Sequence, residues 1–205
     1  RARIEPSSYC REDCFYCPMR KSNVDLERYR LTLDQILDAT EKIRQYKLKN
    51  ILFESGEERG IINTIAKATS LLKQKGYNII LCLGDLEKED YMKLRDNGAD
   101  SYILKFETSD PILFEKLRPK STLKRRLDNL EYLRKLGFKI STGNIVGLPN
   151  QNIESLTNDI LLVEKIQPEM VSASPFIPAE TTPLNNASYG NIDQTLNTLA
   201  IYRKI

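Results

Sequence analysis

Short runs of β-forming residues alternate along this chain with longer stretches of helical period. Three helical stretches end in a glycine just before the next apolar run, in KQKGYNIILCLG, RDNGADSYILKFE and RKLGFKISTGNIVG. Gly76, Gly98 and Gly137 are therefore expected to be left-handed helix C-caps. Strict alternation of strands and helices requires parallel strands joined by right-handed crossovers. The sequence predicts one parallel sheet, either doubly wound or part of a barrel.

Six apolar runs fit the strand positions in this alternation. They are Arg3–Ser7, Ile51–Glu54, Asn78–Leu83, Ser101–Glu107, Lys139–Val146 and Met170–Ser174. The chain contains no GxGxxG or GxxxxGK[ST] segment, the phosphate-binding loops found in many doubly wound sheets. A closed barrel has eight strand–helix units, so six units would form only part of one.

The stretches between the predicted strands carry apolar residues at helical spacing. The apolar stripes fall within Ile36–Tyr46, Ile62–Thr69, Leu123–Leu130 and Ile192–Ala200. Thr32 and Gln35 have the spacing of a capping box, which predicts that the first helix begins there. We expect each stripe to pack against the sheet.

The composition is that of an ordinary folded domain. The 205 residues are 40% hydrophobic, and 31 basic against 28 acidic residues give a formal net charge of +3. This small charge gives no electrostatic argument for a nucleic-acid or membrane partner. The longest apolar run, Ile79–Leu83, is far shorter than the roughly 20 residues of a membrane helix, and residues 1–30 lack a signal-peptide layout. We therefore expect a single cytoplasmic domain over residues 1–205.

Three of the four cysteines lie in the segment CREDCFYCPMR, at Cys10, Cys14 and Cys17. In a reducing compartment, closely spaced cysteines bind metal or do redox chemistry more often than they form disulfides. A structural zinc site needs four ligands, mostly cysteine and histidine, but this chain has no histidine and Cys82 is distant in sequence. An iron–sulfur cluster held by three thiolates leaves one iron open to a small molecule. The residues favour such a cluster.

The CxxxCxxC spacing, the aromatic Tyr16 before the last cysteine and the position after the first strand resemble the radical S-adenosylmethionine (SAM) superfamily. Further segments resemble its HydE-like subgroup, which includes [FeFe]-hydrogenase maturases, methylornithine synthase and biotin synthase. These segments are KSNVDLERYRLTLDQIL, ESGEE, KFETSDPILFEKLRP, NIVGLPNQNIESLTNDILLVEKI and SPFIPAETTPL. The resemblance implies an α/β fold, a partial (β/α)6 TIM-type barrel without the last two βα units of the family barrel. It also implies a [4Fe–4S] cluster whose open iron binds SAM and which, when reduced, cleaves SAM to a 5′-deoxyadenosyl radical.

The resemblance implies roles for polar residues beyond the cysteines. Gly56 and Glu57, in SGEE, match the stretch that holds the amino group of SAM. Glu107 matches a residue that contacts the ribose, and Arg126 matches an arginine that pairs with the SAM carboxylate. Without the resemblance, Gly56 and Glu57 would be interpreted as part of a solvated turn, Glu107 as a helix cap and Arg126 as a surface arginine. The adjacent Arg125 could equally be the arginine that pairs with the SAM carboxylate.

Apolar positions are implied as well. Leu148 and Ile177 lie in segments that pack against the adenine of SAM in the family, and Tyr16 is expected beside the cofactors. Ordinary loop packing is the other explanation for these residues. Cys82 is more often a small buried apolar residue than a ligand, and a second cluster of the biotin synthase type would need several further cysteines.

Lys105 is expected to point into the barrel one layer below Glu107, because side chains alternate along a strand. A buried lysine needs an anion. That anion is either a substrate carboxylate or anionic metal complex, or the carboxylate of Glu54 in an internal ion pair. The subgroup typically has arginine at this position, so the substrate stays open.

The leading hypothesis is a HydE-like radical SAM enzyme of cofactor biosynthesis that acts on a small molecule or a metal–ligand complex. A reduced flavodoxin or ferredoxin would supply the electron. The alternatives are an amino-acid mutase like methylornithine synthase and a noncatalytic metal-binding barrel that needs a partner. Because a partial barrel has unpaired edges, we expect a second copy or another protein to cover the open side.

Overall fold

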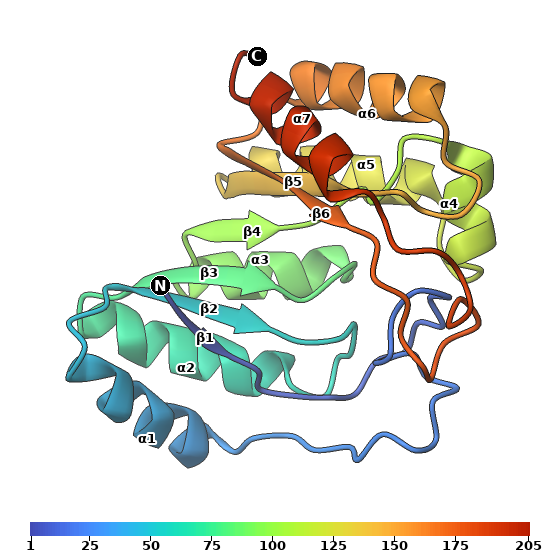
Figure 1. The fold of residues 1–205 in the computed structure, drawn as a ribbon. Helices are drawn as coiled ribbons and strands as arrows, with labels where there is room; N and C mark the ends of the chain where they lie inside the picture. The colour runs from blue at the N-terminus through green and yellow to red at the C-terminus, as the bar shows by residue number, and fades with distance from the viewer.

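A computed structural model describes residues 1–205 and contains one sheet of six parallel strands in the order β1-β2-β3-β4-β5-β6 (Figure 1). The strands are β1 (Ala2–Ile4), β2 (Asn50–Glu54), β3 (Asn78–Cys82), β4 (Ser101–Ile103), β5 (Lys139–Val146) and β6 (Met170–Pro175). Every neighbouring pair is consecutive in the chain and parallel. This is the order of an opened barrel, so the predicted partial (β/α)6 barrel is confirmed.

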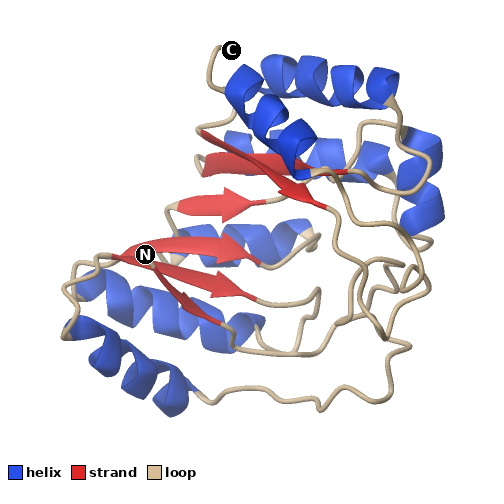
Figure 2. Ribbon diagram, in the orientation of Figure 1, coloured by secondary structure: helices blue, strands red, loops and turns tan.

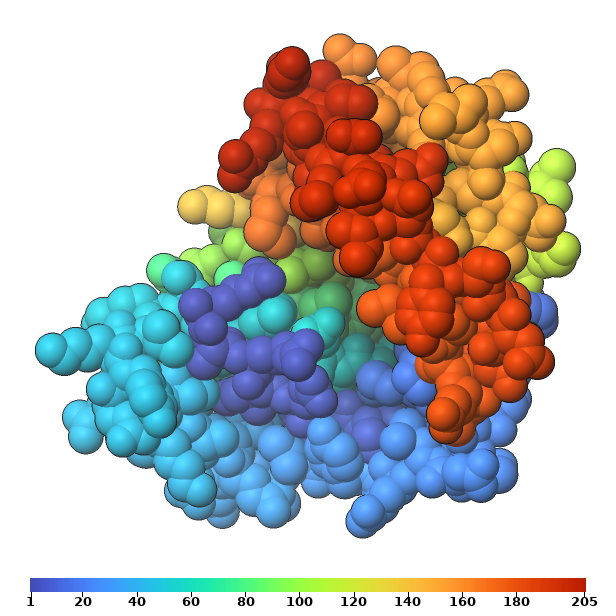
Figure 3. All heavy atoms as spheres, in the orientation of Figure 1, coloured from blue at the N-terminus to red at the C-terminus, as the bar shows by residue number.

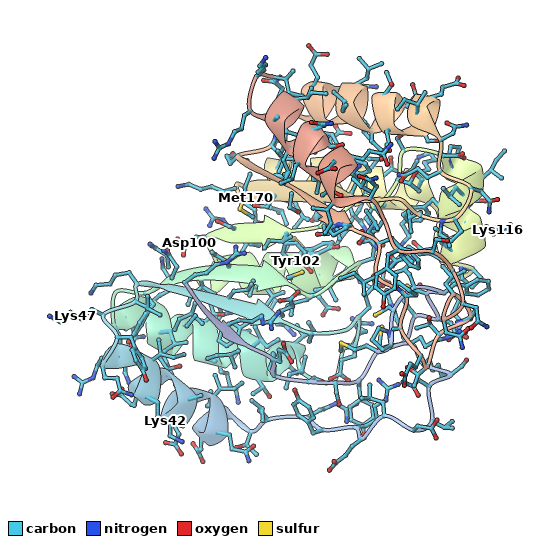
Figure 4. All side chains as sticks on the ribbon, viewed as in Figure 1. Lys42, Lys47, Asp100, Tyr102, Lys116 and Met170 are labelled. Atoms are coloured by element: carbon cyan, nitrogen blue, oxygen red, sulfur yellow. The ribbon has the colours of Figure 1, made fainter.

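Seven helices connect or follow the strands. They are α1 (Leu33–Arg44), α2 (Ile62–Gln74), α3 (Lys88–Asp96), α4 (Pro111–Leu117), α5 (Leu123–Lys135), α6 (Ile153–Ile166) and α7 (Ile192–Tyr202). In Figure 2 all six strand arrows point the same way, and the longest loops gather at the arrowheads. Figure 4 shows Lys116 of α4 at that loop-rich end and Lys47, which precedes β2, at the opposite end. The loops after the strands can therefore build one site together.

The two faces of the strands have different environments. Along β2, β3 and residues 101–105, a segment that begins with β4, one set of alternate residues is almost fully buried in the hydrophobic core: Ile51, Phe53, Ile79, Leu81, Tyr102 and Leu104. The intervening side chains Glu54, Cys82 and Lys105 line a cavity on the other face. The period of two along a strand thus separates the hydrophobic core from the polar interior of the half-barrel.

Several local predictions are confirmed. Thr32 and Gln35 form both hydrogen bonds of the capping box at the start of α1. Gly76, Gly98 and Gly137 follow α2, α3 and α5 and have φ angles of 80°, 98° and 83°. Each helix therefore ends where the sequence predicted, because a residue without a side chain adopts the left-handed conformation at little cost.

The fourth strand is shorter than predicted, and the chain has one more helix than expected. β4 ends at Ile103, and Glu107 makes only an isolated parallel bridge to Asn144. The additional helix, α4, lies between β4 and α5 and begins at the side-chain cap of Asp110. Its seven residues are too few for a helical period to stand out in the sequence.

The predicted apolar faces of two helices are partly wrong. Tyr46 lies beyond the end of α1 and is 70% exposed. On α7, Ile192 and Leu196 are exposed, whereas the buried residues are Thr195, Thr198 and Tyr202. The hydroxyls of both threonines donate to carbonyls one turn back in the helix, so these polar side chains are buried without an unpaired group.

Substitution of Gly143 tests the close contact between β5 and β6. A Cβ at this position would overlap the backbone carbonyl oxygen of Ser172 on β6. We expect Gly143→Ala to lower the free energy of unfolding by about 1–3 kcal/mol, the usual cost of overpacking, as measured by denaturant titration. Ser172→Ala is the control: it removes only the hydroxyl and should neither destabilise much nor rescue Gly143→Ala.

Candidate functional site

The cysteine motif lies in the loop after β1, and all three thiols line one cavity of about 570 Å³. The same cavity is lined by Glu57 after β2, Gly84 after β3 and Glu107 after β4. Figure 3 shows this face hollowed between the blue N-terminal segment and the orange-to-red C-terminal segment, with green strand residues at the bottom. The site is thus built at the carboxyl ends of the strands, where barrel enzymes place their active sites.

The cysteine loop lies directly on the turn after β2. A Cβ at Gly56 would overlap the carbonyl oxygen of Tyr9 and lie 2.6 Å from the Cβ of Cys10, so only glycine permits this approach. The backbone N–H of Arg11 donates to the carbonyl of Glu57 at 2.8 Å, and the N–H of Phe15 donates to the carbonyl of Leu117 at 2.9 Å. The loop is therefore fixed at both ends, against β2 and against α4.

A second anchor of the loop is the buried carboxylate of Glu58. It accepts hydrogen bonds from the hydroxyl of Ser7 at 2.5 Å and from Nε of Arg30 at 2.8 Å. The Arg30 guanidinium also stacks over the ring of Tyr9, 4.0 Å from its centroid. These contacts hold Ser7 and Tyr9, two of the three residues before Cys10.

The donor set fits an iron–sulfur cluster. Burial raises the pKa of the Cys10, Cys14 and Cys17 thiols, to about 12 for Cys14, while the nearby Arg118 opposes the shift at Cys14. Thiols with such pKa values become thiolates only when a metal replaces the proton. No three or more Cys, Asp or Glu side chains converge as ligands of a single ion, whereas a cluster takes one thiolate on each iron.

A buried network of charges forms the wall beside the thiols. Oε1 of Glu57 lies 2.7 Å from Nη2 of Arg118 and 3.2 Å from Nη2 of Arg126, and Arg126 also pairs with Asp85 at 3.1 Å. All four residues are at least nine-tenths buried. Oε2 of Glu57 and Nε of Arg126 have no hydrogen-bond partner, and both residues line the cavity.

The network identifies two residues that the sequence interpretation missed. Arg118, directly after α4, also bonds the hydroxyl of Tyr16 at 3.2 Å. Glu12, between the first two cysteines, lines the cavity and has an unpartnered Oε2. Burial, and next the charge of Glu57, raise the pKa of Glu12. Arg118 lies at the end of the segment KFETSDPILFEKLRP, which resembles the subgroup, and Glu12 lies between two cysteines. These positions were the only sequence signals for the two residues.

Glu107 and Lys105 meet in the cavity, but Lys105 does not pair with Glu54. Nζ of Lys105 lies 3.3 Å from Oε2 of Glu107, while Glu54 pairs with Arg3 at 3.4 Å. The alternative in which Lys105 pairs with Glu54 is therefore wrong. Glu107 has φ of 63°, and this left-handed conformation turns its carboxylate back toward the lysine two residues earlier.

The structure places the remaining predicted residues in different surroundings. Leu148 is buried in a small apolar cluster near Tyr16, and Ile177 is 61% exposed. Neither lines the cavity, whereas Tyr16 does. Cys82 also lines it, and burial raises the pKa of its thiol to about 12. The cavity thus brings together every predicted polar residue and omits the two predicted adenine contacts.

Two adjacent arginines test the buried network. Arg126→Ala leaves the Glu57 and Asp85 carboxylates buried with less compensation, so we expect it to lower the free energy of unfolding by about 3–5 kcal/mol. Arg125 is exposed and pairs with the exposed Glu87, so Arg125→Ala should cost less than about 1 kcal/mol. Chemical denaturation measures both. Equal losses in the two variants would contradict the network.

Comparison with known proteins agrees with this geometry. The model of the Radical SAM superfamily matches residues 4–163. The chain is 38% identical to the [FeFe] hydrogenase maturase subunit HydE of Thermotoga maritima, over 99% of this chain and 59% of that protein. It is 27% identical to 3-methylornithine synthase of Methanosarcina acetivorans, over 97% and 57% of the two chains.

A solved structure has the same fold. The crystal structure of methylornithine synthase (PylB) superposes with a TM-score of 0.89 at 23% identity, over 99% of this chain and 60% of that one. The chain thus spans about three fifths of the length of these relatives. No helix of the structure is long and apolar enough to cross a membrane. Because the family model covers most of the chain, this protein belongs to the radical SAM superfamily, whose enzymes use a [4Fe–4S] cluster and SAM.

Proposed function

We propose that Cys10, Cys14 and Cys17 hold the [4Fe–4S] cluster and that residues 1–205 form the radical SAM core domain of a HydE-like enzyme. The observation that carries this proposal is the cavity itself: the three cysteines line a space of about 570 Å³ together with Glu12 and Glu57, each of which has a carboxylate oxygen without a hydrogen-bond partner. When bound, the reduced cluster supplies the reductive cleavage of SAM to a 5′-deoxyadenosyl radical.

The chain's own residues bind and orient SAM in this proposal. The free Oε2 of Glu57 accepts from the amino group, and Gly56 lets that turn approach the cysteine loop. The SAM carboxylate binds at Arg126, whose guanidinium is already held by Glu57 and Asp85. Glu107 accepts hydrogen bonds from the ribose, since a carboxylate has acceptor capacity for two hydroxyls. Tyr16 closes the wall beside the cluster.

We propose that Leu148 and Ile177, the two predicted adenine contacts, contribute less to SAM binding than the polar residues do. Ile177 is exposed near the loop-rich end of the sheet and is free to cover the base, whereas Leu148, which is 2% exposed, would support the rim from behind. The substrate is a small molecule or a metal–ligand complex, and an electron carrier of the flavodoxin or ferredoxin type supplies the electron. We place the reaction in hydrogenase cofactor maturation because the identity to HydE, 38%, exceeds the 27% to a 3-methylornithine synthase. A noncatalytic scaffold would not need free carboxylate oxygens around the thiols.

Anaerobic reconstitution tests the cluster and SAM binding. We expect an oxygen-sensitive [4Fe–4S] cluster, a change in the electron paramagnetic resonance spectrum of the reduced cluster on adding SAM, and formation of 5′-deoxyadenosine. Cys14→Ala should lose the cluster, whereas Cys82→Ala should keep it and serves as the matched control. Zinc in place of iron, or a cluster retained in Cys14→Ala, would refute the assignment.

Lys105 is proposed as the substrate anchor, one layer below the SAM site. Its only close anion, Glu107, lies at 3.3 Å and is itself assigned to SAM, so the ammonium is free to bind a substrate carboxylate or an anionic complex. We expect Lys105→Ala to cleave SAM without substrate but to lose coupled turnover by roughly 30-fold or more, since truncating a buried charge pair costs about 2–5 kcal/mol. Coupled turnover that stays normal would remove Lys105 from the site.

A further inference from the structure

Asp159 is a buried carboxylate outside the cavity. It lies on α6, on the outer side of the sheet, and is 0% exposed. Its Oδ1 accepts a hydrogen bond from the backbone N–H of Ser109 at 2.6 Å. Its Oδ2 accepts from Nδ2 of Asn144 at 2.7 Å and from Nε2 of Gln151 at 3.3 Å. No cation pairs with it, so these three neutral donors must offset the cost of burying its charge.

Two of the three donors hold the segment that contains Glu107. Ser109 is two residues after Glu107, and Asn144 is its bridge partner on β5. The backbone of Glu107 is bonded on both sides: its N–H donates to Gly143 at 3.1 Å, and its carbonyl accepts from Ile145 at 2.9 Å. Asp159 therefore closes a ring of contacts around the Glu107 backbone without touching the Glu107 side chain.

The third donor holds a different rim segment. Oε1 of Gln151 accepts hydrogen bonds from the N–H groups of Gly147 at 2.6 Å and Leu148 at 3.3 Å. Its Nε2 donates to Asp159 and also to the carbonyl of Ile145 at 3.0 Å. One carboxylate on an outer helix thus links the segment after β4 to the segment after β5.

Glu107 needs such support because of its backbone conformation. A non-glycine residue in the left-handed region costs on the order of 1–3 kcal/mol and persists only where its surroundings enforce it. Glu107 has φ of 63°, and it lies beyond the end of β4, where it pairs with β5 through one isolated bridge. Loss of the Asp159 contacts would let this segment relax and move the Glu107 carboxylate out of the cavity.

We propose that Asp159 is a positioning residue that sets the affinity for SAM from outside the site, by fixing the Glu107 segment and the Gly147–Leu148 segment against each other. This inference rests on the proposed role of Glu107 at SAM. It differs from a general contribution to stability, because the ring of contacts around Asp159 converges on one backbone position at the cavity rim.

Matched variants of the network separate positioning from stability. Asp159→Asn keeps an acceptor for Ser109 but sets its amide NH₂ against the NH₂ of Asn144. Adding Asn144→Asp restores a donor–acceptor pair between positions 144 and 159. Nε2 of Gln151 still faces the amide that Asp159→Asn introduces. Tyr202→Phe is the control, since it removes only the 3.2 Å bond from the Tyr202 hydroxyl to the other side of Asn144 and leaves every bond of Asp159 in place.

Three measurements on the reconstituted protein and its variants test the proposal: SAM affinity by calorimetry, melting temperature, and amide hydrogen exchange at residues 104–109 without SAM. We expect Asp159→Asn to weaken SAM binding at least tenfold and to speed exchange at these residues, with most of both effects reversed in the double variant. Tyr202→Phe should lower the melting temperature while changing SAM affinity less than about threefold. The proposal is overturned if Tyr202→Phe weakens SAM binding as much as Asp159→Asn at equal loss of stability.

The exchange measurement distinguishes failure of this inference from failure of the proposed function. Unchanged exchange at residues 104–109 in Asp159→Asn would overturn the positioning role whatever the SAM affinity. Normal SAM binding by Glu107→Gln would instead overturn the assignment of Glu107 to SAM, and with it the claim that Asp159 sets affinity. Faster exchange with weakened binding in Asp159→Asn, reversed by Asn144→Asp, supports both.

Discussion

The buried carboxylate of Glu57, shared between the guanidinium groups of Arg118 and Arg126, holds together the parts of the site that are far apart in the sequence. Glu57 follows β2, Arg118 follows α4, and Arg126 lies on α5. Three charges buried in one wall are stable only when each is paired and hydrogen-bonded, because a single unpaired ion costs several kcal/mol. The pairing therefore makes the positions of α4, α5 and the cysteine loop depend on one another.

The same wall also places charged groups near the three buried thiols. Glu12, Glu57 and Asp85 face Arg118, Arg126 and the partly exposed Arg11, and burial, followed by the charge of Glu57, raises the pKa of Glu12. Thiolates would add further negative charge beside them, and burial accordingly keeps the pKa of the thiols high. These thiols are therefore expected to ionise only when iron replaces their protons.

Sequence patterns predicted what depends on local spacing and failed where distant residues meet. The order of strands, the capping box at Thr32 and the cysteine motif are encoded within a few residues each, and all were recognised. Arg118 reaches a carboxylate 61 positions away, and the donors to Asp159 come from three separate segments, so no local pattern could reveal them. Arg125 and Arg126 are neighbours on α5, so the sequence alone does not show which of them is buried. The position of Glu57, which pairs with Arg126, determines this.

In the proposed arrangement, the residues for SAM and those for the substrate occupy different levels of the half-barrel. Glu54 and Cys82 are aligned partners on β2 and β3, and both line the cavity together with Lys105 and Arg3. Arg3, Glu54 and Cys82 lie on strands, and Lys105 lies two residues after β4. Of the proposed polar SAM contacts, Glu57 and Glu107 come from the segments that follow strands, and Arg126 comes from α5. The loops are fixed by backbone approach and by buried ion pairs, which tolerate few substitutions. The side chains of the strand layer are constrained by alternation and by charge balance, and Lys105 also contacts Glu107, a proposed SAM residue, at 3.3 Å. Substrate preference within this fold is therefore expected to vary mainly through that inner strand layer.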